Sequence, residues 1–353
     1  MTDMSPLRAP ANLPSLVKTA FTNAKATGDL SYFPTQAALL KLNSVHLQLR
    51  FSPALASKPK GPEPSSSNKD DANKKKPFNP FENPLPSMTV VPRLPPSHAL
   101  VLNKFAVVPE HSILITRGMK PQAHVLEADD LAAALACVRA YASAAHGHDK
   151  GAEAVSGGGD GVGGGSSELF VFFNSGPHSG ASQPHRHLQL LPVEQMRAGL
   201  EDPSSWNVLA EGSDEQLRSL PFAVLREAIG PDTSAEDLHA KYVGLYRRAA
   251  RLVSPGDGED VPGEGEARFS YNMALTSRAI ALCPRVAEGA PITDRDGREI
   301  GQVQLNGTLL AGTALVKNQE LYDAIREDPE LLSNVLKQIG VQPHENETVL
   351  GNL

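Results

Sequence analysis

The stretch Asn174–Pro192, NSGPHSGASQPHRHLQLLP, determines how the rest of this chain is interpreted. Within it, His185, His187 and Gln189 recur at a spacing of two. On a β-strand this spacing sends all three side chains to one face and the intervening Arg186 to the other. Three polar groups that bond well to phosphate or to a metal therefore converge on one patch. We expect the strand to cover residues 185–191.

A loop of small residues precedes this patch. It contains Gly176, Ser179, Gly180, Ser182 and Gln183, whose small side chains leave backbone N–H groups free. Successive free N–H groups form concave nests that bind phosphoryl oxygens. The loop and the three polar side chains together favour binding of a phosphate-containing ligand.

A metal site built on His-x-His is the alternative, because neutral imidazole is a common zinc ligand. His178 or His111 would supply a third ligand. Gln189 is a poor zinc ligand and no cysteine lies near the motif, so phosphate chemistry is favoured. We expect no metal site and no tightly bound cofactor; a divalent cation such as Mg²⁺ would arrive with a polyphosphate.

Hydrophobic periodicity predicts a mixture of helices and strands and hence an α+β fold. Helices are expected at 13–26, from Asp129 or Asp130 onward, at 235–252, and after Asp328, with Pro329 in the first turn and Gly340 at the end. Val45, Leu47 and Leu49 alternate with polar residues, as in a half-buried strand. Further strands are expected at 98–107, 111–116, 168–173, 269–276, 279–282 and 309–317.

Composition limits the class of protein. The chain has 353 residues, a net charge of −7 and two cysteines. The acidic balance argues against a nucleic acid polymer as partner, and the few cysteines fit a reducing compartment. Neither a signal peptide nor a membrane span is legible, so a cytoplasmic, or also nuclear, location is expected. The segments at about 56–77 and 151–167, and a shorter one at 254–267, have the composition of flexible insertions.

The His-x-His-x-Gln motif resembles the signature of the diadenosine tetraphosphate (Ap4A) phosphorylases, or ATP adenylyltransferases, a branch of the histidine-triad superfamily. Hydrolases of that superfamily have histidine at the third place. The resemblance extends along most of the chain, over the segments 24–30, 47–59, 79–81, 102–105, 111–116, 271–276, 284–285 and 306–317. Where the family often has methionine in its last segment, this chain has Thr313.

The resemblance implies a histidine-triad-like fold, with an antiparallel sheet, flanking helices and a C-terminal α/β extension. Residues 1–205 would form the catalytic part and residues 206–353 a nucleotide-binding part. His187 would attack the α-phosphate of Ap4A and expel ATP, and inorganic phosphate would release ADP from the adenylyl-histidine. His185 would orient His187, and Gln189, which cannot act as a general base, would disfavour attack by water.

The resemblance also implies the ligand contacts. The substrate-binding residues transferred by position are Lys58, Asn103, Lys104, Asn174, Gly180, Ala181, Ser182, Gln183, Gln304, Leu305, Asn306, Thr313 and Lys317. The partners implied are nucleotides and phosphate, and a monomer is compatible with the sequence. Four other functions remain open at this point: a transferase acting on nucleotide sugars, an Ap4A hydrolase, a non-catalytic nucleotide sensor and a histidine-based metalloenzyme.

Overall fold

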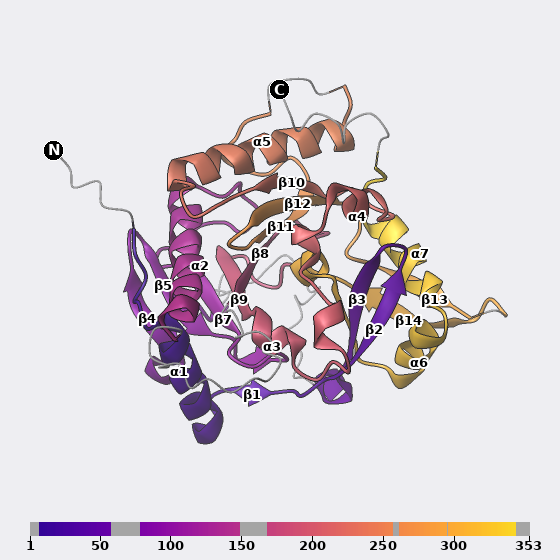
Figure 1. Ribbon diagram of the computed structural model, residues 1–353, viewed down its shortest axis with the longest axis horizontal. Helices are drawn as coiled ribbons and strands as arrows, with labels where there is room; N and C mark the ends of the chain where they lie inside the picture. The colour runs from indigo at the N-terminus through magenta and orange to yellow at the C-terminus, as the bar shows by residue number, and fades with distance from the viewer. Residues whose placement is uncertain (1–6, 58–77, 149–167, 257–260, 295, 344–353) are drawn as a thin grey trace, which may run out of the picture.

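An antiparallel sheet of eight strands runs through the computed structural model, which describes residues 7–57, 78–148, 168–256, 261–294 and 296–343 (Figure 1). The strand order is β10-β12-β11-β8-β9-β7-β5-β4, and every neighbouring pair is antiparallel. The strands are β4 (Thr89–Leu94), β5 (His98–Leu102), β7 (Ser112–Thr116), β8 (Leu169–Ser175), β9 (His187–Pro192), β10 (Leu225–Ala228), β11 (Ser270–Leu275) and β12 (Ala279–Arg285).

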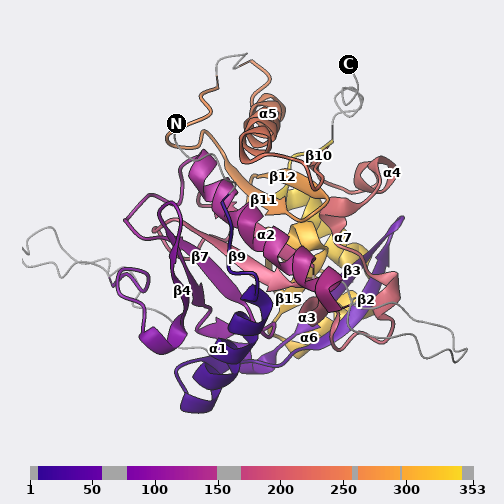
Figure 2. The same ribbon diagram turned by 60° about the vertical axis from the view of Figure 1, so that its left-hand side comes forward.

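Both faces of this sheet are covered. Along β8, Val171 and Phe173 pack into one apolar core, while Phe170 and Phe172 pack into another on the opposite face. This explains why the first five residues of β8, 169–173, are all apolar. Helices α1 (Leu13–Thr27), α2 (Ala128–His148) and α5 (Ala235–Val253) cover the first face (Figure 2).

The second face is covered by elements from the two ends of the chain. Strand β15 (Thr313–Val316) pairs in parallel with β3 (Val45–Phe51), which pairs with β2 (Gln36–Leu42). The hairpin of β13 (Gly289–Thr293) and β14 (Glu299–Gln304) and the helices α6 (Gln319–Glu327) and α7 (Glu330–Ile339) complete this layer. The short elements are β1 (Ser31–Tyr32), β6 (Phe105–Ala106), α3 (Val193–Arg197), α4 (Asp214–Arg218), η1 (Pro53–Ser57), η2 (Pro86–Met88), η3 (Pro203–Ser205), η4 (Leu209–Glu211) and η5 (Gly307–Ala311).

The predicted helices are confirmed within a few residues. Helix α1 ends where Gly28 adopts the left-handed conformation with φ of 79°, as a glycine C-cap does. Before α7, the side chain of Asp328 accepts a hydrogen bond from the N–H of Glu330, and Gly340 ends the helix. The α+β class and the antiparallel sheet are confirmed as well.

Three predicted strands differ from the structure. Strand β9 begins at His187, because residues 185 and 186 pair with the segment 120–122 instead. The predicted strand 98–107 is interrupted at Asn103, whose side chain accepts from the N–H of Phe105. The predicted strand 309–317 is wrong at its start: residues 307–311 form η5, which Asn306 caps and the left-handed Gly312 ends.

The predicted half-burial of β3 is also wrong. Leu47 and Leu49 are buried as expected, but Gln48 and Arg50 on the opposite face are buried too. Alternation in the sequence does not distinguish a polar face in water from one against a polar cavity. In β3 the second situation holds, since Arg50 lines a cavity described below.

Strands from both sides of residue 205 contribute to the eight-stranded sheet, with β4, β5, β7, β8 and β9 before it and β10, β11 and β12 after it. The division into parts 1–205 and 206–353 stays a prediction. The insertions expected at about 56–77 and 151–167 lie, apart from residues 56 and 57, outside the described residues.

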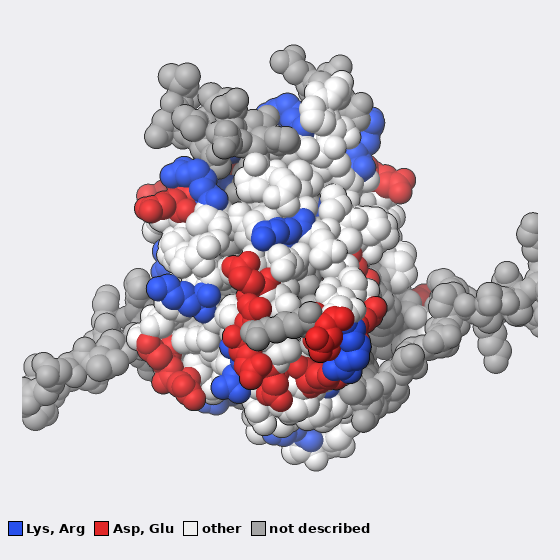
Figure 3. Space-filling model, turned by 90° about the vertical axis from the view of Figure 1, so that its right-hand side faces the viewer, with Lys and Arg blue, Asp and Glu red and all other residues white. Residues whose placement is uncertain are grey.

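Acidic side chains gather on the face formed by the C-terminal elements, with lysines and arginines more scattered (Figure 3). On this face Arg298 forms ion pairs with Asp294 and Glu320. Because this surface is acidic, the cations that would hold an anionic ligand must be sought locally, inside the fold.

No helix in the described part of the chain has the length and hydrophobicity needed to cross a bilayer.

Candidate active site

The imidazole of His187 is held in one tautomer. Its Nδ1 lies 2.8 Å from the backbone carbonyl oxygen of His185. Because a carbonyl oxygen can only accept, Nδ1 carries the proton and Nε2 keeps its lone pair. The sequence interpretation gave the orienting role to His185, and the contact comes from its backbone rather than its ring.

Burial keeps this imidazole neutral. His187 is 3% exposed, and its ring lies 5.1 Å from that of Phe81 between centroids. Desolvation lowers the pKa of His187 to about 4, although the hydrogen bond to His185 acts in the opposite direction. At neutral pH the Nε2 atom is therefore unprotonated and keeps its lone pair.

The ring of His185 is fixed by two other partners. Its Nε2 donates to the carbonyl of Thr116 at 2.8 Å, and its Nδ1 accepts from the side-chain amide of Asn79 at 2.9 Å. Both ring nitrogens are hydrogen-bonded, and His185 as a whole is 1% exposed. His185 therefore anchors the start of the motif to the segments around Thr116 and Asn79.

Gln122 holds the backbone of His187, and the sequence analysis did not identify it. Its Oε1 accepts from the N–H of His187 at 2.8 Å, and its Nε2 donates to the carbonyls of Asn174 and His187 at 2.8 and 3.2 Å. Continuing the β8–β9 register would place Asn174 opposite His187. The side-chain amide of Gln122 thus takes the place of a strand-to-strand contact, and β8 and β9 separate at His187.

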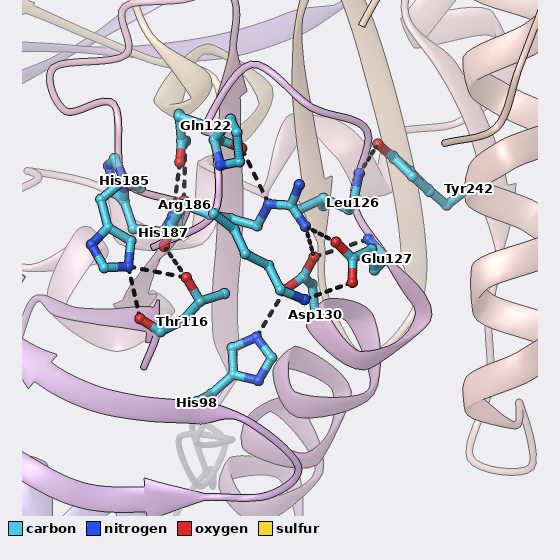
Figure 4. A network of polar contacts seen from close by, with 12 residues as sticks. His98, Thr116, Gln122, Leu126, Glu127, Asp130, His185, Arg186, His187 and Tyr242 are labelled. Carbon is cyan, nitrogen blue, oxygen red and sulfur yellow. Dashed lines mark hydrogen bonds and ion pairs between the residues drawn. The ribbon is translucent and has the colours of Figure 1, made fainter. Parts of the chain in front are cut away.

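Arg186 extends to the opposite side of the strand from His187, as the alternation predicts. Its guanidinium forms ion pairs with Asp130 at 2.9 Å and with Glu127 at 2.8 Å (Figure 4). The second oxygen of Asp130 accepts from Nε2 of His98 at 2.9 Å. Burial raises the pKa of Asp130, but the hydrogen bond from His98 and the charge of Arg186 outweigh it, and the pKa is lowered. This network ties the motif to the first turn of α2.

A cavity of about 420 Å³ lies between the sheet and the layer formed by β3, β15 and β14. Gln189 and Leu191 of β9 reach it from the sheet, consistent with a spacing of two from His187. Seven of the predicted site residues line this cavity: Gly180, Gln189, Gln304, Leu305, Asn306, Thr313 and Lys317. The fold therefore brings together predicted site residues that lie more than a hundred positions apart in the sequence.

His111 is a further imidazole in this cavity, considered from the sequence only as a metal ligand. Its ring contacts the side chains of Gln189 and Asn103. Desolvation lowers its pKa to about 4, so it too is neutral at pH 7. Among the described residues no group of three or more His, Cys, Asp or Glu is arranged to hold a metal.

The small-residue loop packs against the C-terminal layer. Gly180 has φ of +78°, and a Cβ there would lie 2.7 Å from Cβ of Asn306, so only glycine fits. The side-chain oxygen of Asn174 accepts from the N–H of Gly307 at 2.8 Å and from Asn272 at 2.9 Å. These contacts bring the loop and the start of η5 to the same edge of the cavity.

The other predicted binding residues lie outside the cavity lining. Ala181 and Gln183 are half-buried and Ser182 is exposed in the loop. Asn103 touches the cavity indirectly, through His111. Lys104 is exposed, with its Nζ 5.9 Å from the ring centre of Phe105. Lys58 lies outside the described residues.

Comparison with known proteins assigns the family. The Ap4A phosphorylase N-terminal domain matches residues 3–154 and 166–206, and the ATP adenylyltransferase C-terminal domain matches residues 218–342. The chain belongs to the Ap4A phosphorylase family. It is 30% identical to diadenosine 5′,5‴-P1,P4-tetraphosphate phosphorylase 2 of Saccharomyces cerevisiae, over 93% of this chain and 94% of that protein.

Two further similarities agree with this Ap4A phosphorylase assignment. Protein APA1 of Saccharomyces cerevisiae is 28% identical over 94% of this chain and 95% of its own length. The crystal structure of yeast Ap4A phosphorylase Apa2 in complex with Ap4A has a TM-score of 0.67 and 25% identity, covering 94% of this chain and 98% of that one. The family is one of nucleotidyltransferases, which confirms the enzyme class expected from the motif.

Replacing Gln122 tests how it positions His187. In Gln122→Ala, the N–H of His187 loses its acceptor, and a displacement of a reacting group by about 1 Å costs roughly 100-fold in rate. We expect kcat to fall by about that factor while KM changes by less than about threefold. The matched control is Gln338→Ala on the exposed side of α7, whose kcat should equal that of wild type. A loss confined to KM would contradict the positioning role.

Replacing Asp130 tests the buried ion pair. Asp130→Ala leaves Arg186 without its buried partner, which costs about 3–5 kcal/mol of unfolding free energy. Lys120→Ala removes a part-exposed ion pair of the same network, with Glu127, and should cost about 0–1 kcal/mol. Urea denaturation at pH 7 measures both. Because the pKa of Asp130 is lowered, its contribution is present above the unfolded pKa of about 3.9 and lost as the pH falls through the folded value. Equal losses in the two variants would contradict the assignment.

Proposed function

We propose that this protein cleaves Ap4A by phosphorolysis to ADP and ATP, with His187 as the nucleophile. The observation that carries the proposal is the hydrogen bond from Nδ1 of His187 to the carbonyl of His185, which leaves Nε2 with a free lone pair. Membership of the Ap4A phosphorylase family supports the substrate, as does similarity to a yeast enzyme crystallised with Ap4A. A hydrolase or a non-catalytic sensor is not favoured by any of these relatives.

In the first step, Nε2 of His187 forms a bond to the α-phosphorus of one adenosine. The bond between that phosphorus and the oxygen bridging to the next phosphate breaks, and the electron pair leaves with ATP. In the second step, an oxygen of inorganic phosphate attacks the same phosphorus, the P–N bond breaks, and ADP leaves. Both steps are reversible, so ATP and ADP can also form Ap4A.

Neutral groups surround the nucleophile in this proposal. Gln189 donates a hydrogen bond to a phosphoryl oxygen but cannot take a proton from water. His111, held by Asn103 and Gln189, fixes the orientation of the Gln189 amide. Inorganic phosphate is already anionic and needs no base, whereas water does. This difference would favour phosphorolysis over hydrolysis.

The remaining site residues are assigned by position and cavity. Backbone N–H groups of Gly180, Ala181, Ser182 and Gln183 would bind phosphoryl oxygens, and Lys58, Lys104 and Lys317 would add positive charge. Gln304, Leu305, Asn306 and Thr313, which line the cavity, would contact the nucleotide, and Asn174 would fix their position through Gly307. No cofactor is required, and Mg²⁺ would enter with the polyphosphate.

Three wider assignments belong to the same proposal. The antiparallel sheet that carries His-x-His-x-Gln would be a member of the histidine-triad fold, with residues 206–353 as the nucleotide-binding extension. The partners would be nucleotides and phosphate, with the protein acting as a monomer. Its location would be cytoplasmic or also nuclear. Among the described residues no helix is long and apolar enough to span a membrane.

Trapping the intermediate tests the nucleophile. Without phosphate, wild type should release about one equivalent of ATP from Ap4A and retain AMP on the peptide that contains His187, as mass spectrometry can locate. Added phosphate should then release ADP. His187→Ala should do neither, while His46→Ala, at an exposed position on β3, should behave as wild type. Turnover in His187→Ala, or AMP as the product in phosphate, would overturn the proposal.

The pH dependence of the first step tests the buried, neutral imidazole. A neutral imidazole attacks and a protonated one does not, so the rate falls as the pH drops through the pKa of His187. With that pKa at about 4, ATP release in the first turnover should stay constant from about pH 8 to about pH 5. An exposed histidine would lose most of its activity by then, because its pKa is about 6.5. A midpoint near 6.5 in rapid-quench measurements would contradict the burial argument.

A further inference from the structure

One wall of the cavity carries two cations. Strands β15 and β3 pair in parallel with Thr313 opposite Gln48 and Leu315 opposite Arg50. Because side chains alternate along a strand, Gln48 and Arg50 share one face with Thr313, Leu315 and the adjoining Lys317. Of these, Arg50, Thr313, Leu315 and Lys317 line the cavity. The facing wall, formed by Phe172, Gln189 and Leu191, is neutral.

Arg50 is a buried charge with neutral partners. It is 3% exposed. Its Nε donates to Oε1 of Gln48 at 3.0 Å, its Nη1 donates to Oγ1 of Thr35 at 2.7 Å, and its Nη2 donates to the carbonyl of Met196. Within the described residues, no carboxylate lies within ion-pair distance of Arg50. Lys317 and the lining carboxylate Glu288 are both exposed to solvent.

The other buried arginines show what Arg50 lacks. Arg186 is neutralised by Asp130 and Glu127. Arg285 donates to five oxygen atoms, which hold the segments around Asn272, Ile339, Glu288 and Leu305 together, and it is not part of the cavity lining. Arg50 has five N–H groups, three of which find acceptors among the described residues, and it faces a cavity.

A buried cation without a counter-charge is costly, and an anion bound beside it removes that cost. Burial lowers the pKa of Arg50 to about 10, which still leaves it protonated at neutral pH. Guanidinium matches phosphate oxygens with two parallel hydrogen bonds. The chemistry of this position therefore selects an anionic group with oxygen acceptors.

The position of Arg50 relative to β9 indicates which phosphate of the ligand it would contact. Met196, whose carbonyl accepts from Arg50, follows β9, and Leu191 lies four residues after His187 on that strand. Four residues of strand span about 14 Å. Arg50 therefore lies over the far part of β9, away from the phosphorus that bonds to His187.

We propose that Arg50 binds a phosphate group of the ligand that is not attacked, on a cationic wall that it shares with Lys317. The identity of the ligand rests on the proposed function, but the anion-binding role of Arg50 does not. Loss of the Arg50 charge should weaken each phosphate-bearing ligand and leave the nucleoside alone unaffected. A contact from Arg50 to the adenine ring is the competing assignment.

Calorimetry with three probes tests the role: tripolyphosphate, ATP and adenosine, each titrated into the full chain. A charge-assisted hydrogen bond pair to phosphate predicts about 10- to 100-fold weaker tripolyphosphate and ATP binding in Arg50→Gln. Adenosine affinity should change by less than about twofold. Arg50→Lys, which keeps the charge but loses the paired geometry, should lie between wild type and Arg50→Gln for the two anions.

Thr35→Ala is the matched control for the structural contacts of Arg50. It removes the acceptor of Nη1 and keeps the charge, so the affinity for tripolyphosphate should change by less than about threefold. The dependence of tripolyphosphate affinity on salt gives a second readout, because it should weaken in Arg50→Gln and persist in Thr35→Ala. Circular dichroism checks that each variant is folded, and if Arg50→Gln is not, Arg50→Lys and Thr35→Ala decide the question.

Three outcomes would overturn the inference: unchanged tripolyphosphate binding in Arg50→Gln, an equal loss of adenosine and tripolyphosphate affinity, or an equal loss in Thr35→Ala and Arg50→Lys. None of them bears on the reaction itself. Wild-type product analysis decides the proposed function separately, since ADP, and ATP beyond the single equivalent of the first turnover, must form from Ap4A only when phosphate is present. Failure there would leave the binding result on Arg50 intact.

Discussion

The N–H of His187 donates to the side chain of Gln122 rather than to the neighbouring strand β8. Much of the site depends on this hydrogen bond. An uninterrupted β8–β9 ladder would pair residue 187 with residue 174 and keep the imidazole of His187 in the middle of a closed sheet. Gln122 supplies one acceptor and one donor, so the backbone groups on both strands stay satisfied while the strands separate. The sheet thus opens at the position of the imidazole without burying an unpaired backbone group.

The two faces of the motif strand divide the work between stability and chemistry. On the helical face, Arg186 is fully buried and neutralised by Asp130, which itself accepts from His98. Such a pair is strongly destabilising when one partner is removed, so it fixes the strand against α2. On the other face, the carbonyl of His185 fixes the tautomer of His187, and burial removes its proton at neutral pH. A one-residue shift of register would exchange the two sets, so the ion pair also specifies that His187, and not Arg186, lies on the face opposite α2.

The sequence was sufficient where the signal is local. Periodicity and capping residues predicted α1, α5 and α7, and the spacing of two placed Gln189 in the cavity and Arg186 on the opposite side. The apolar run at 309–316 has the composition of a strand, but the cap at Asn306 and the left-handed Gly312 fold its first half into η5. Local composition could not reveal that effect.

Long-range contacts were beyond the sequence. Gln122 lies 65 positions before His187, and nothing near it marks an amide inserted between two strands. Asn103, which the family resemblance predicted to bind substrate, contacts His111 rather than the cavity itself. The sequence had suggested His111 only as a metal ligand. The alternation of apolar and polar side chains in β3 predicted the buried leucines. The same alternation occurs whether the polar face of the strand meets water or a cavity.

The net charge of −7 and the anionic ligand are reconciled by where the cations lie. Exposed lysines and arginines on an acidic surface contribute little, because water and salt screen them within about 10 Å. A guanidinium buried in the wall of a cavity is screened far less, so one such group binds phosphate more strongly than several exposed ones. Arg50 is of this kind. An acidic surface then does not oppose binding of a small polyphosphate, while it disfavours long nucleic acids that must lie along the surface.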